Sequence, residues 1–301
     1  MVVGVDVGGT TTSVGLVTRD GAVLATEIAP THGRGPATAE GTVTALLERV
    51  LERAAGQDVT VGAIGVGVPA TVDPASGVIG ESHHTPELTG RHLGRVLGAR
   101  FALPAFVDND VNALALSEWM FGLGRGARAL VVLATGTGIG AGIVLDGRLV
   151  RGSAGYAGEF GHASVRFEGR ACWCGGHGCL VVYASGRGIA EAAGGRAAPL
   201  VFQAAAGGEA AAGAVVDEAC DALGAMIGTI VNGLNPDVVV VTGGVAAAYA
   251  ARETRVLRAA GRHALALALA RTRIAIVPGD KHATVRGPAA LAFYETGDLA
   301  P

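Results

Sequence analysis

A short run of acids and amides, Asp108-Asn109-Asp110-Val111-Asn112, follows the apolar residues 105–107 and precedes a segment with helical spacing. A carboxylate at the end of a strand can take the proton of an alcohol while the alcohol oxygen attacks a phosphoryl group. Asp and Asn are also the preferred N-caps of helices, and capping explains Asp108 equally well. The run therefore predicts phosphoryl-transfer chemistry, but its spacing alone does not say which acid would be the base.

Two turns rich in glycine and threonine have the composition of phosphate-binding loops. The first is Gly8-Gly9-Thr10-Thr11, and the second is Thr135-Gly136-Thr137-Gly138. Glycine lets the backbone approach a polyphosphate, successive amides in a tight turn form an anion-binding concavity, and threonine hydroxyls add donors. Asp6, at the end of an apolar strand, would hold Mg²⁺ directly or through water, because a bare carboxylate would repel phosphate oxygens.

The segments around the two turns align with each other. Gly9-Thr10 falls on Gly136-Thr137, Gly15 on Gly142 and, after one dropped residue, Asp20-Gly21 on Asp146-Gly147. Each segment reads as a strand, a Gly/Thr turn, a second strand and an Asp-Gly hairpin turn. Chance similarity is the alternative in a chain with 49 glycines. Because the register persists through the hairpin, we interpret the chain as a duplicated nucleotide-binding protein.

Two other nucleotide-binding motifs are excluded. A P-loop needs Gly-x4-Gly-Lys-Ser/Thr, whereas the single lysine, Lys281, is followed by His282. Residues 136–141 match a relaxed dinucleotide pattern, Gly-x-Gly-x-x-Ala, but that motif must open a helix. Here it leads into residues 142–147, which have the pattern of a strand and a turn.

Three clustered cysteines predict a tetrahedral zinc site of the Cys3His type. They are Cys172, Cys174 and Cys179, on a glycine-rich stretch. Spacing allows either His162 or His177 as the fourth ligand. Disulfide pairing is disfavoured, because the cluster holds an odd number of cysteines. Four protein ligands leave no open position, so we expect a structural zinc ion.

Alternating strands and helices must position these residues. Apolar runs predict strands at residues 59–68, 105–107 and 238–241, and helical spacing predicts helices at 39–55, 93–97, 111–120 and 214–234. Turns with polar residues follow the strands, and the strand at 238–241 leads into Gly243-Gly244. This alternation indicates an α/β architecture with ligands at the carboxyl edges of the strands. Cys220, on the long helix, is expected to be a buried thiol.

Composition limits the function classes. The chain has 301 residues, half of them apolar, but no run long enough to span a bilayer and no secretion signal. We therefore expect a cytoplasmic protein without a membrane partner. The net charge of -3 and the scattered arginines predict no nucleic-acid partner. Length as a prior suggests two domains.

With these residues in place, the sequence resembles the ROK (repressor, open reading frame, kinase) family of the sugar kinase/Hsp70/actin superfamily. The resemblance covers nearly the whole chain and rests on six motifs in a shared order. They are Asp6-x-Gly8-Gly9-Thr10, Asp108-Asn109-Asp110-x-Asn112, Gly136-Thr137-Gly138-x-Gly140, Gly158-Glu159-x-Gly161-His162, Cys172-x-Cys174-x4-Cys179 and Thr242-Gly243-Gly244. It implies two ribonuclease-H-like domains with a cleft between them: residues 1–112 joined by a C-terminal helix at about 286–301, and residues 113–285 with the inserted zinc motif.

The resemblance also implies a role for each site residue. Asp110 matches the base that deprotonates a sugar hydroxyl, and Asn109, Glu159 and His162 match sugar contacts. His162 also matches a zinc ligand beside the three cysteines, which favours it over His177. The Gly/Thr turns would bind ATP, with Gly243-Gly244 against the adenosine. Family members are commonly homodimers or homotetramers, so we expect such an assembly.

The expected function is ATP- and Mg²⁺-dependent phosphorylation of a primary hydroxyl of a hexose, with glucose as the family default. Three departures concern the sugar pocket: Val181 stands where family kinases usually have a Glu that contacts a hydroxyl, Ala70 replaces a common Gly, and residues 82–88 lack an Asn-Leu pair. A valine cannot accept a hydrogen bond. Val181 therefore raises the alternative of a deoxy, anomerically altered or carbocyclic substrate such as a C7 cyclitol.

Two further classes are less expected. A ROK repressor would carry a helix-turn-helix domain before the first hairpin, whereas Met1 leads directly into the first strand. A sugar-binding pseudokinase would fit Val181, but the retained Asp6, Asn109 and Asp110 favour an active kinase.

Overall fold

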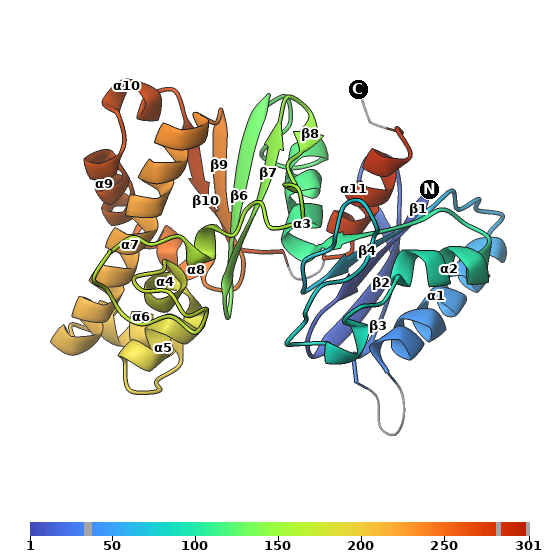
Figure 1. The fold of residues 1–301 in the computed structure, drawn as a ribbon, viewed down its shortest axis with the longest axis horizontal. Coiled ribbons are helices and arrows are strands. Elements are labelled where there is room, and N and C mark those ends of the chain that lie inside the picture. Colours follow the sequence, from blue (N-terminus) through green and yellow to red (C-terminus); the bar gives the residue numbers. More distant parts are fainter. Residues whose placement is uncertain (33–37, 281–283, 299–301) are drawn as a thin grey trace. The chain divides into compact units, whose positions relative to one another are not determined.

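The computed structural model describes residues 1–32, 38–280 and 284–298, and this part of the chain forms two compact units (Figure 1). The first unit contains Met1–Gly126, Leu149–Ala157 and the described residues 284–298. The second contains Ala127–Arg148 and Gly158–Asp280. Within the described residues, every helix is too short or too polar to cross a membrane.

The first unit is built on a five-stranded sheet with the order β3-β2-β1-β4-β5. Its strands are β1 (Val2–Val7), β2 (Thr11–Val17), β3 (Val23–Pro30), β4 (Ile64–Val68) and β5 (Ala105–Asn109). Strands β1 to β3 form an antiparallel meander, whereas β4 and β5 continue the sheet in parallel with β1. Its helices are α1 (Ala39–Ala55), α2 (Leu93–Phe101), α3 (Asp110–Met120) and α11 (Arg286–Glu295).

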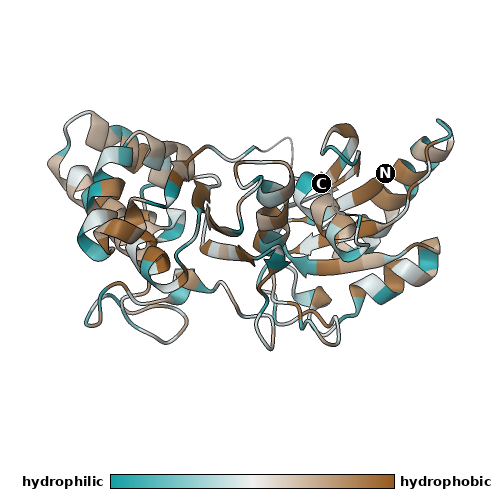
Figure 2. Ribbon diagram, turned by 90° about the horizontal axis from the view of Figure 1, so that it is seen from above, coloured by the Kyte–Doolittle hydropathy of each residue, from teal (hydrophilic) through white to brown (hydrophobic). Residues whose placement is uncertain are grey.

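Helix packing in this unit follows from the side chains that face the sheet. The apolar stripe predicted for α1, which includes Val43, Leu46 and Leu47, is buried, and the strands that it faces are largely hydrophobic (Figure 2). Helix α11 lies close against β1 and β4 because the strands present glycine there. A Cβ atom on Gly65 would stand 1.8 Å from the carbonyl oxygen of Pro288. The predicted extension of this helix to 301 includes residues outside the described part of the chain, and the observed helix ends at Glu295.

The second unit repeats the topology of the first. Its strands are β6 (Ala129–Thr135), β7 (Ile139–Leu145), β8 (Arg148–Leu149), β9 (Val238–Thr242) and β10 (Arg273–Ile276), in the order β10-β9-β6-β7-β8. Strands β6 and β7 are antiparallel, and β9 and β10 run parallel to β6. Its helices are α4 (Val181–Ala184), α5 (Gly186–Ala192), α6 (Ala198–Ala206), α7 (Ala210–Leu234), α8 (Ala246–Ala250), α9 (Glu253–His263) and α10 (Ala266–Leu269). The shared strand order agrees with the duplication inferred from the two hairpins.

The sequence alignment of the two hairpins does not hold on both sides of the turn, where it is wrong by one residue. Strands β1 and β2 pair Val7 with Thr12, whereas β6 and β7 pair Thr135 with Ile139. An even number of residues lies between Val7 and Thr12, whereas an odd number lies between Thr135 and Ile139. A single shift in residue number therefore cannot align both strands of one hairpin with both strands of the other. A difference in turn length therefore shifts the register that the sequence alignment assumed.

Candidate active site

Thr31, which was not identified from the sequence, donates hydrogen bonds to two carbonyl oxygens of the first Gly/Thr turn. Thr31 Oγ1 donates to the carbonyl oxygen of Gly8 at 2.6 Å, and Thr31 N donates to that of Thr10 at 2.9 Å. Thr31 is itself buried and hydrogen bonded to Thr12 through their hydroxyls, 2.9 Å apart. These bonds to Thr31 occupy the carbonyl oxygens of Gly8 and Thr10 and hold the turn in place.

Asp6 ends its strand in a largely buried position. Burial raises the pKa of its carboxyl group, while a hydrogen bond to Thr284 acts in the opposite direction. Desolvation disfavours the charged form, and a nearby cation would favour it. A carboxylate oxygen is the kind of ligand that Mg²⁺ prefers, so Asp6 could hold this ion.

Asn109, rather than Asp108, is the N-cap of α3. Its Oδ1 accepts from Val111 N at 2.9 Å and from Asn112 N at 3.2 Å. Its Nδ2 donates to the carbonyl oxygen of Ala70 at 3.2 Å. The capping interpretation of Asp108 is thus wrong, because the strand continues through Asp108 and the helix begins one residue after the cap.

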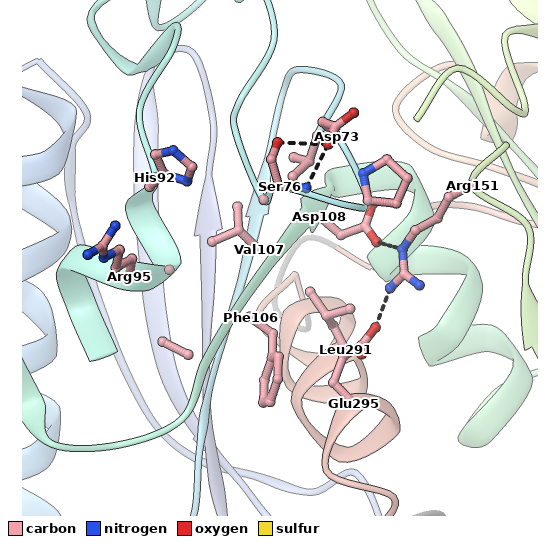
Figure 3. Close-up of a pocket in the computed structure, with 15 residues that line it drawn as sticks. Asp73, Ser76, His92, Arg95, Phe106, Val107, Asp108, Arg151, Leu291 and Glu295 are labelled. Carbon is pink, nitrogen blue, oxygen red and sulfur yellow. Dashed lines mark hydrogen bonds and ion pairs between the residues drawn. The ribbon is translucent and has the colours of Figure 1, made fainter. Parts of the chain in front are cut away.

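Asp108 is buried and held by three partners. Its Oδ1 accepts from Asn109 N at 2.7 Å and from Asn112 Nδ2 at 2.8 Å, and its Oδ2 pairs with Arg151 Nε at 2.5 Å. Arg151 also pairs with Glu295 of α11 (Figure 3). These bonds commit both oxygens of Asp108 to the protein, so Asp108 is a poor candidate for a base.

Arg151 was not identified from the sequence, where it is one arginine among many. Burial alone would lower the pKa of its guanidinium, but Asp108 and Glu295 raise it. The three side chains also border a cavity of about 420 Å³ (Figure 3). The ion pairs join the segment at Arg151, the end of β5 and the end of α11 within the first unit.

Asp110 is the first residue of α3 and is partly exposed; its Oδ1 accepts from Val111 N at 2.9 Å. The sheet places it on the same edge as the first turn, since Asp6 pairs with Gly67 and Gly67 pairs with Asp108. Two strand spacings amount to about 10 Å. The first unit alone therefore brings the first Gly/Thr turn and the Asn109-Asp110 pair to one edge of one sheet.

The second unit brings its two predicted nucleotide elements together. Thr135 Oγ1 donates to the carbonyl oxygen of Thr242 at 3.1 Å, and Val245 N donates to that of Thr135 at 3.0 Å. Gly243 has a φ of 109°, and a Cβ atom there would lie 2.6 Å from the carbonyl oxygen of Thr135. Only glycine fits this approach, which sets Gly243-Gly244 beside the Thr135–Gly138 turn.

The four predicted metal ligands form one cluster in the second unit. The ligand atoms of His162, Cys172, Cys174 and Cys179 all lie within 4.8 Å of one another. Cys172 Sγ is 3.6 Å from His162 Nδ1, and Cys174 Sγ is 3.7 Å from Cys179 Sγ. A tetrahedral ion with Zn–S bonds of about 2.3 Å separates its ligands by about 3.7 Å. The described cluster contains His162 and not His177, and its dimensions suit zinc.

Glu159 and His162 share one short 3-10 turn, because Glu159 immediately precedes Phe160–His162 and its carbonyl oxygen accepts from His162 N at 3.0 Å. Glu159 is exposed, so its carboxylate is accessible to a ligand. Val181, predicted to face a sugar hydroxyl, begins α4 and is only 2% exposed. Its side chain therefore presents almost no surface to a substrate.

Comparison with known protein families decides the relationship. The model of the ROK family matches residues 2–294. The chain belongs to the ROK family. It is 36% identical over 191 residues to a glucokinase of Streptomyces coelicolor, a match that covers 63% of this chain. That match spans 57% of the length of the Streptomyces glucokinase.

Solved ROK structures have the same fold. A ROK hexokinase from Thermus thermophilus is 31% identical, with a TM-score of 0.87 over 99% of both chains. A ROK family glucokinase from Streptomyces griseus, determined in complex with glucose and AMPPNP, is 29% identical, with a TM-score of 0.74 over 97% of this chain and 98% of that chain. The predicted α/β fold with ribonuclease-H-like, actin-like ATPase domains is confirmed.

Proposed function

We propose that this protein transfers the γ-phosphoryl group of ATP to a primary hydroxyl of a hexose, with glucose as the preferred acceptor. The observation that supports this best is the register of the first sheet, which sets Asp6 and Asp108 about 10 Å apart and so brings the turn of residues 8–11 and Asp110 to the same edge. That separation leaves room for a phosphoryl group on the turn and for an alcohol oxygen beside the carboxylate. The similarity to a glucokinase bound to glucose and AMPPNP supports the same pair of substrates.

Asp110 is the general base of the proposed reaction. As the sugar oxygen attacks the γ-phosphorus, its proton passes to a carboxylate oxygen of Asp110, the new P–O bond forms and ADP leaves. Asp108 is less suited to this role, since it is buried and its oxygens already accept from Asn109 N, Asn112 Nδ2 and Arg151 Nε. Asn109, Glu159 and His162 are proposed to bind the sugar hydroxyls and hold the reacting oxygen in line.

The nucleotide is proposed to bind through backbone amides of both Gly/Thr turns, with Gly243-Gly244 against the adenosine. Asp6 would hold Mg²⁺, which neutralises charge on the phosphate oxygens when it is bound. Zinc would be structural, because His162 and the three cysteines fill a tetrahedral shell. Its role would be to fix His162 in the orientation that the sugar requires.

The substitution Asp110→Asn tests the base. We expect kcat with glucose to fall by about 10² to 10⁴, the range for loss of a general base, while AMPPNP binding stays unchanged. The matched control is Asp58→Asn, because Asp58 is exposed and has a φ of 55°, a conformation that asparagine also adopts. If Asp110→Asn retains turnover, the base is misassigned; if the unmodified protein binds AMPPNP but phosphorylates no sugar, the acceptor class is wrong.

A further inference from the structure

The loop that carries the three cysteines touches α5 through one stacked pair. The guanidinium of Arg187 lies over the ring of Trp173, with Cζ 4.2 Å from the ring centroid. At this distance, the cation is attracted by the ring quadrupole, modestly because both side chains are partly exposed. Trp173 stands between Cys172 and Cys174, two of the clustered thiols, so its backbone belongs to the metal-binding loop.

The backbone at the start of α5 holds the second phosphate-binding turn. Gly186 N donates to the carbonyl oxygen of Gly136 at 2.8 Å, and Arg187 N donates to that of Thr137 at 3.2 Å. The first amides of a helix have no acceptor within the helix, so these bonds satisfy them and fix the turn at the same time. Arg187 thus reaches the turn with its backbone and the cysteine loop with its side chain.

The start of α5 is itself well anchored. Ser185 Oγ accepts from Gly188 N at 2.9 Å and caps the helix. Arg187 Nε donates to Glu191 Oε1 at 2.7 Å, one helical turn further on. A displacement of Arg187 would therefore move the first turn of α5. It would also move the carbonyl oxygens of Gly136 and Thr137, which accept hydrogen bonds from that helical turn.

We propose that Trp173 and Arg187 are positioning residues that couple the cysteine loop to the phosphate-binding turn at Thr137. This inference rests on the proposed function, which takes that turn as part of the ATP site. Metal held by Cys172 and Cys174 fixes the chain on both sides of Trp173 and keeps its ring over Arg187. Loss of the ring leaves α5 less constrained, so nucleotide affinity falls while sugar affinity does not.

The test measures AMPPNP binding by calorimetry on the full chain. Trp173→Ala keeps all four metal-binding residues, so its zinc content should match that of the unmodified protein while its Kd for AMPPNP rises about threefold, the size expected for an exposed cation–π contact. Trp173→Phe keeps an aromatic ring and should recover most of the affinity. KM for glucose should not change in either variant.

A double-mutant cycle separates the effect of the Trp173–Arg187 contact on AMPPNP affinity from the effects of the single side chains. Arg187→Gln should weaken AMPPNP binding by a similar factor, and adding Trp173→Ala should weaken it little further. Glu191→Gln is the matched control, because it removes the negative charge that pairs with Arg187 and keeps the stacked ring; its affinity should equal that of the unmodified protein. Additive losses, or zinc-loaded Trp173→Ala with unchanged affinity, overturn the coupling. Failure of the unmodified protein to bind AMPPNP overturns the nucleotide site as well.

The fluorescence of Trp173 gives a readout that does not depend on turnover. The chain has two tryptophans, so Trp119→Phe leaves Trp173 as the single emitter. Its emission should change when zinc is removed by a chelator and again when AMPPNP is added to the zinc-loaded protein. Emission that responds to neither treatment contradicts the coupling.

Discussion

Asp108 and Asp110 lie two residues apart in one motif, yet their surroundings make them differently suited to accept a proton from a substrate. Asp108 is buried with both oxygens bonded, whereas Asp110 is partly exposed at the start of a helix. The motif could be read from the sequence, because it is local. The partners could not: Arg151 and Thr31 are distant in the chain from the residues that they hold, and neither has a local pattern.

Removal of the Arg151 side chain should therefore lower both the free energy of unfolding and kcat. In Arg151→Met, Asp108 remains buried with one oxygen unpaired, and we expect a loss of about 3 kcal/mol in the free energy of unfolding. We also expect kcat to fall, since Asp108 bonds directly to the backbone of Asn109, while the Kd for AMPPNP should change little. Thermal unfolding and steady-state kinetics measure the two effects.

Arg128→Met is the control for this prediction. Arg128 pairs with Asp146, but the two side chains are 84% and 70% exposed, so solvent screening should leave the pair little effect on stability. The double variant Arg151→Met/Asp108→Asn should recover part of the lost stability, because it no longer buries an unpaired charge. Equal melting temperatures for Arg151→Met and Arg128→Met would refute the role given to the buried pair.

At the scale of elements, the periodicity of apolar residues predicted which helices and strands exist better than it predicted where they end or how the strands pair. The helix at 39–55 was predicted with the observed bounds, whereas the strand predicted at 59–68 is confined to Ile64–Val68. The one-residue shift between the hairpins has the same origin. Pairing of strands depends on turn geometry and on neighbouring strands, and a repeated Gly/Thr composition does not specify the number of residues in the turn.

The cysteine loop is the element whose order should depend most on metal. Residues 163–179 form isolated bridges rather than regular strands, and Arg166 and Arg170 attach them to Tyr183 at 5.3 and 4.7 Å from its ring centroid. Chelation of zinc should lower the melting temperature, and added Zn²⁺ should restore it. A purified protein that contains no zinc would contradict this prediction.

Thiol labelling shows which element responds to the chelator. Without metal, the three clustered cysteines should react with a thiol reagent in the folded protein. Cys220 should stay unreactive, because it is buried in α7 and burial raises the pKa of its thiol to about 12. Labelling of Cys220 at the same rate as the others would mean that chelation unfolds more than the loop.

At the scale of the whole molecule, the residues proposed for sugar and magnesium binding are divided between the two units. Asp6, Asn109 and Asp110 belong to the first unit, and Glu159 and His162 to the second. The duplicated pair of hairpins led us to expect two similar halves. The sequence could not predict how buried each side chain is, and Val181 is the clearest example.

Substrate choice is accordingly a prediction about the complete chain. Because Val181 is buried, it offers no surface that would reject a hydroxyl, and the proposed polar contacts with the sugar reward hydroxyls in matching positions. We expect kcat/KM for glucose to exceed that for N-acetylglucosamine and for a C7 cyclitol by at least about tenfold, measured by coupled ADP release with ATP. A 6-deoxy sugar, which lacks the primary hydroxyl, is the control and should give no turnover above the background ATPase rate. A higher kcat/KM for the cyclitol than for glucose would favour the carbocyclic alternative and would mean that the Val181 position acts on the substrate despite its burial.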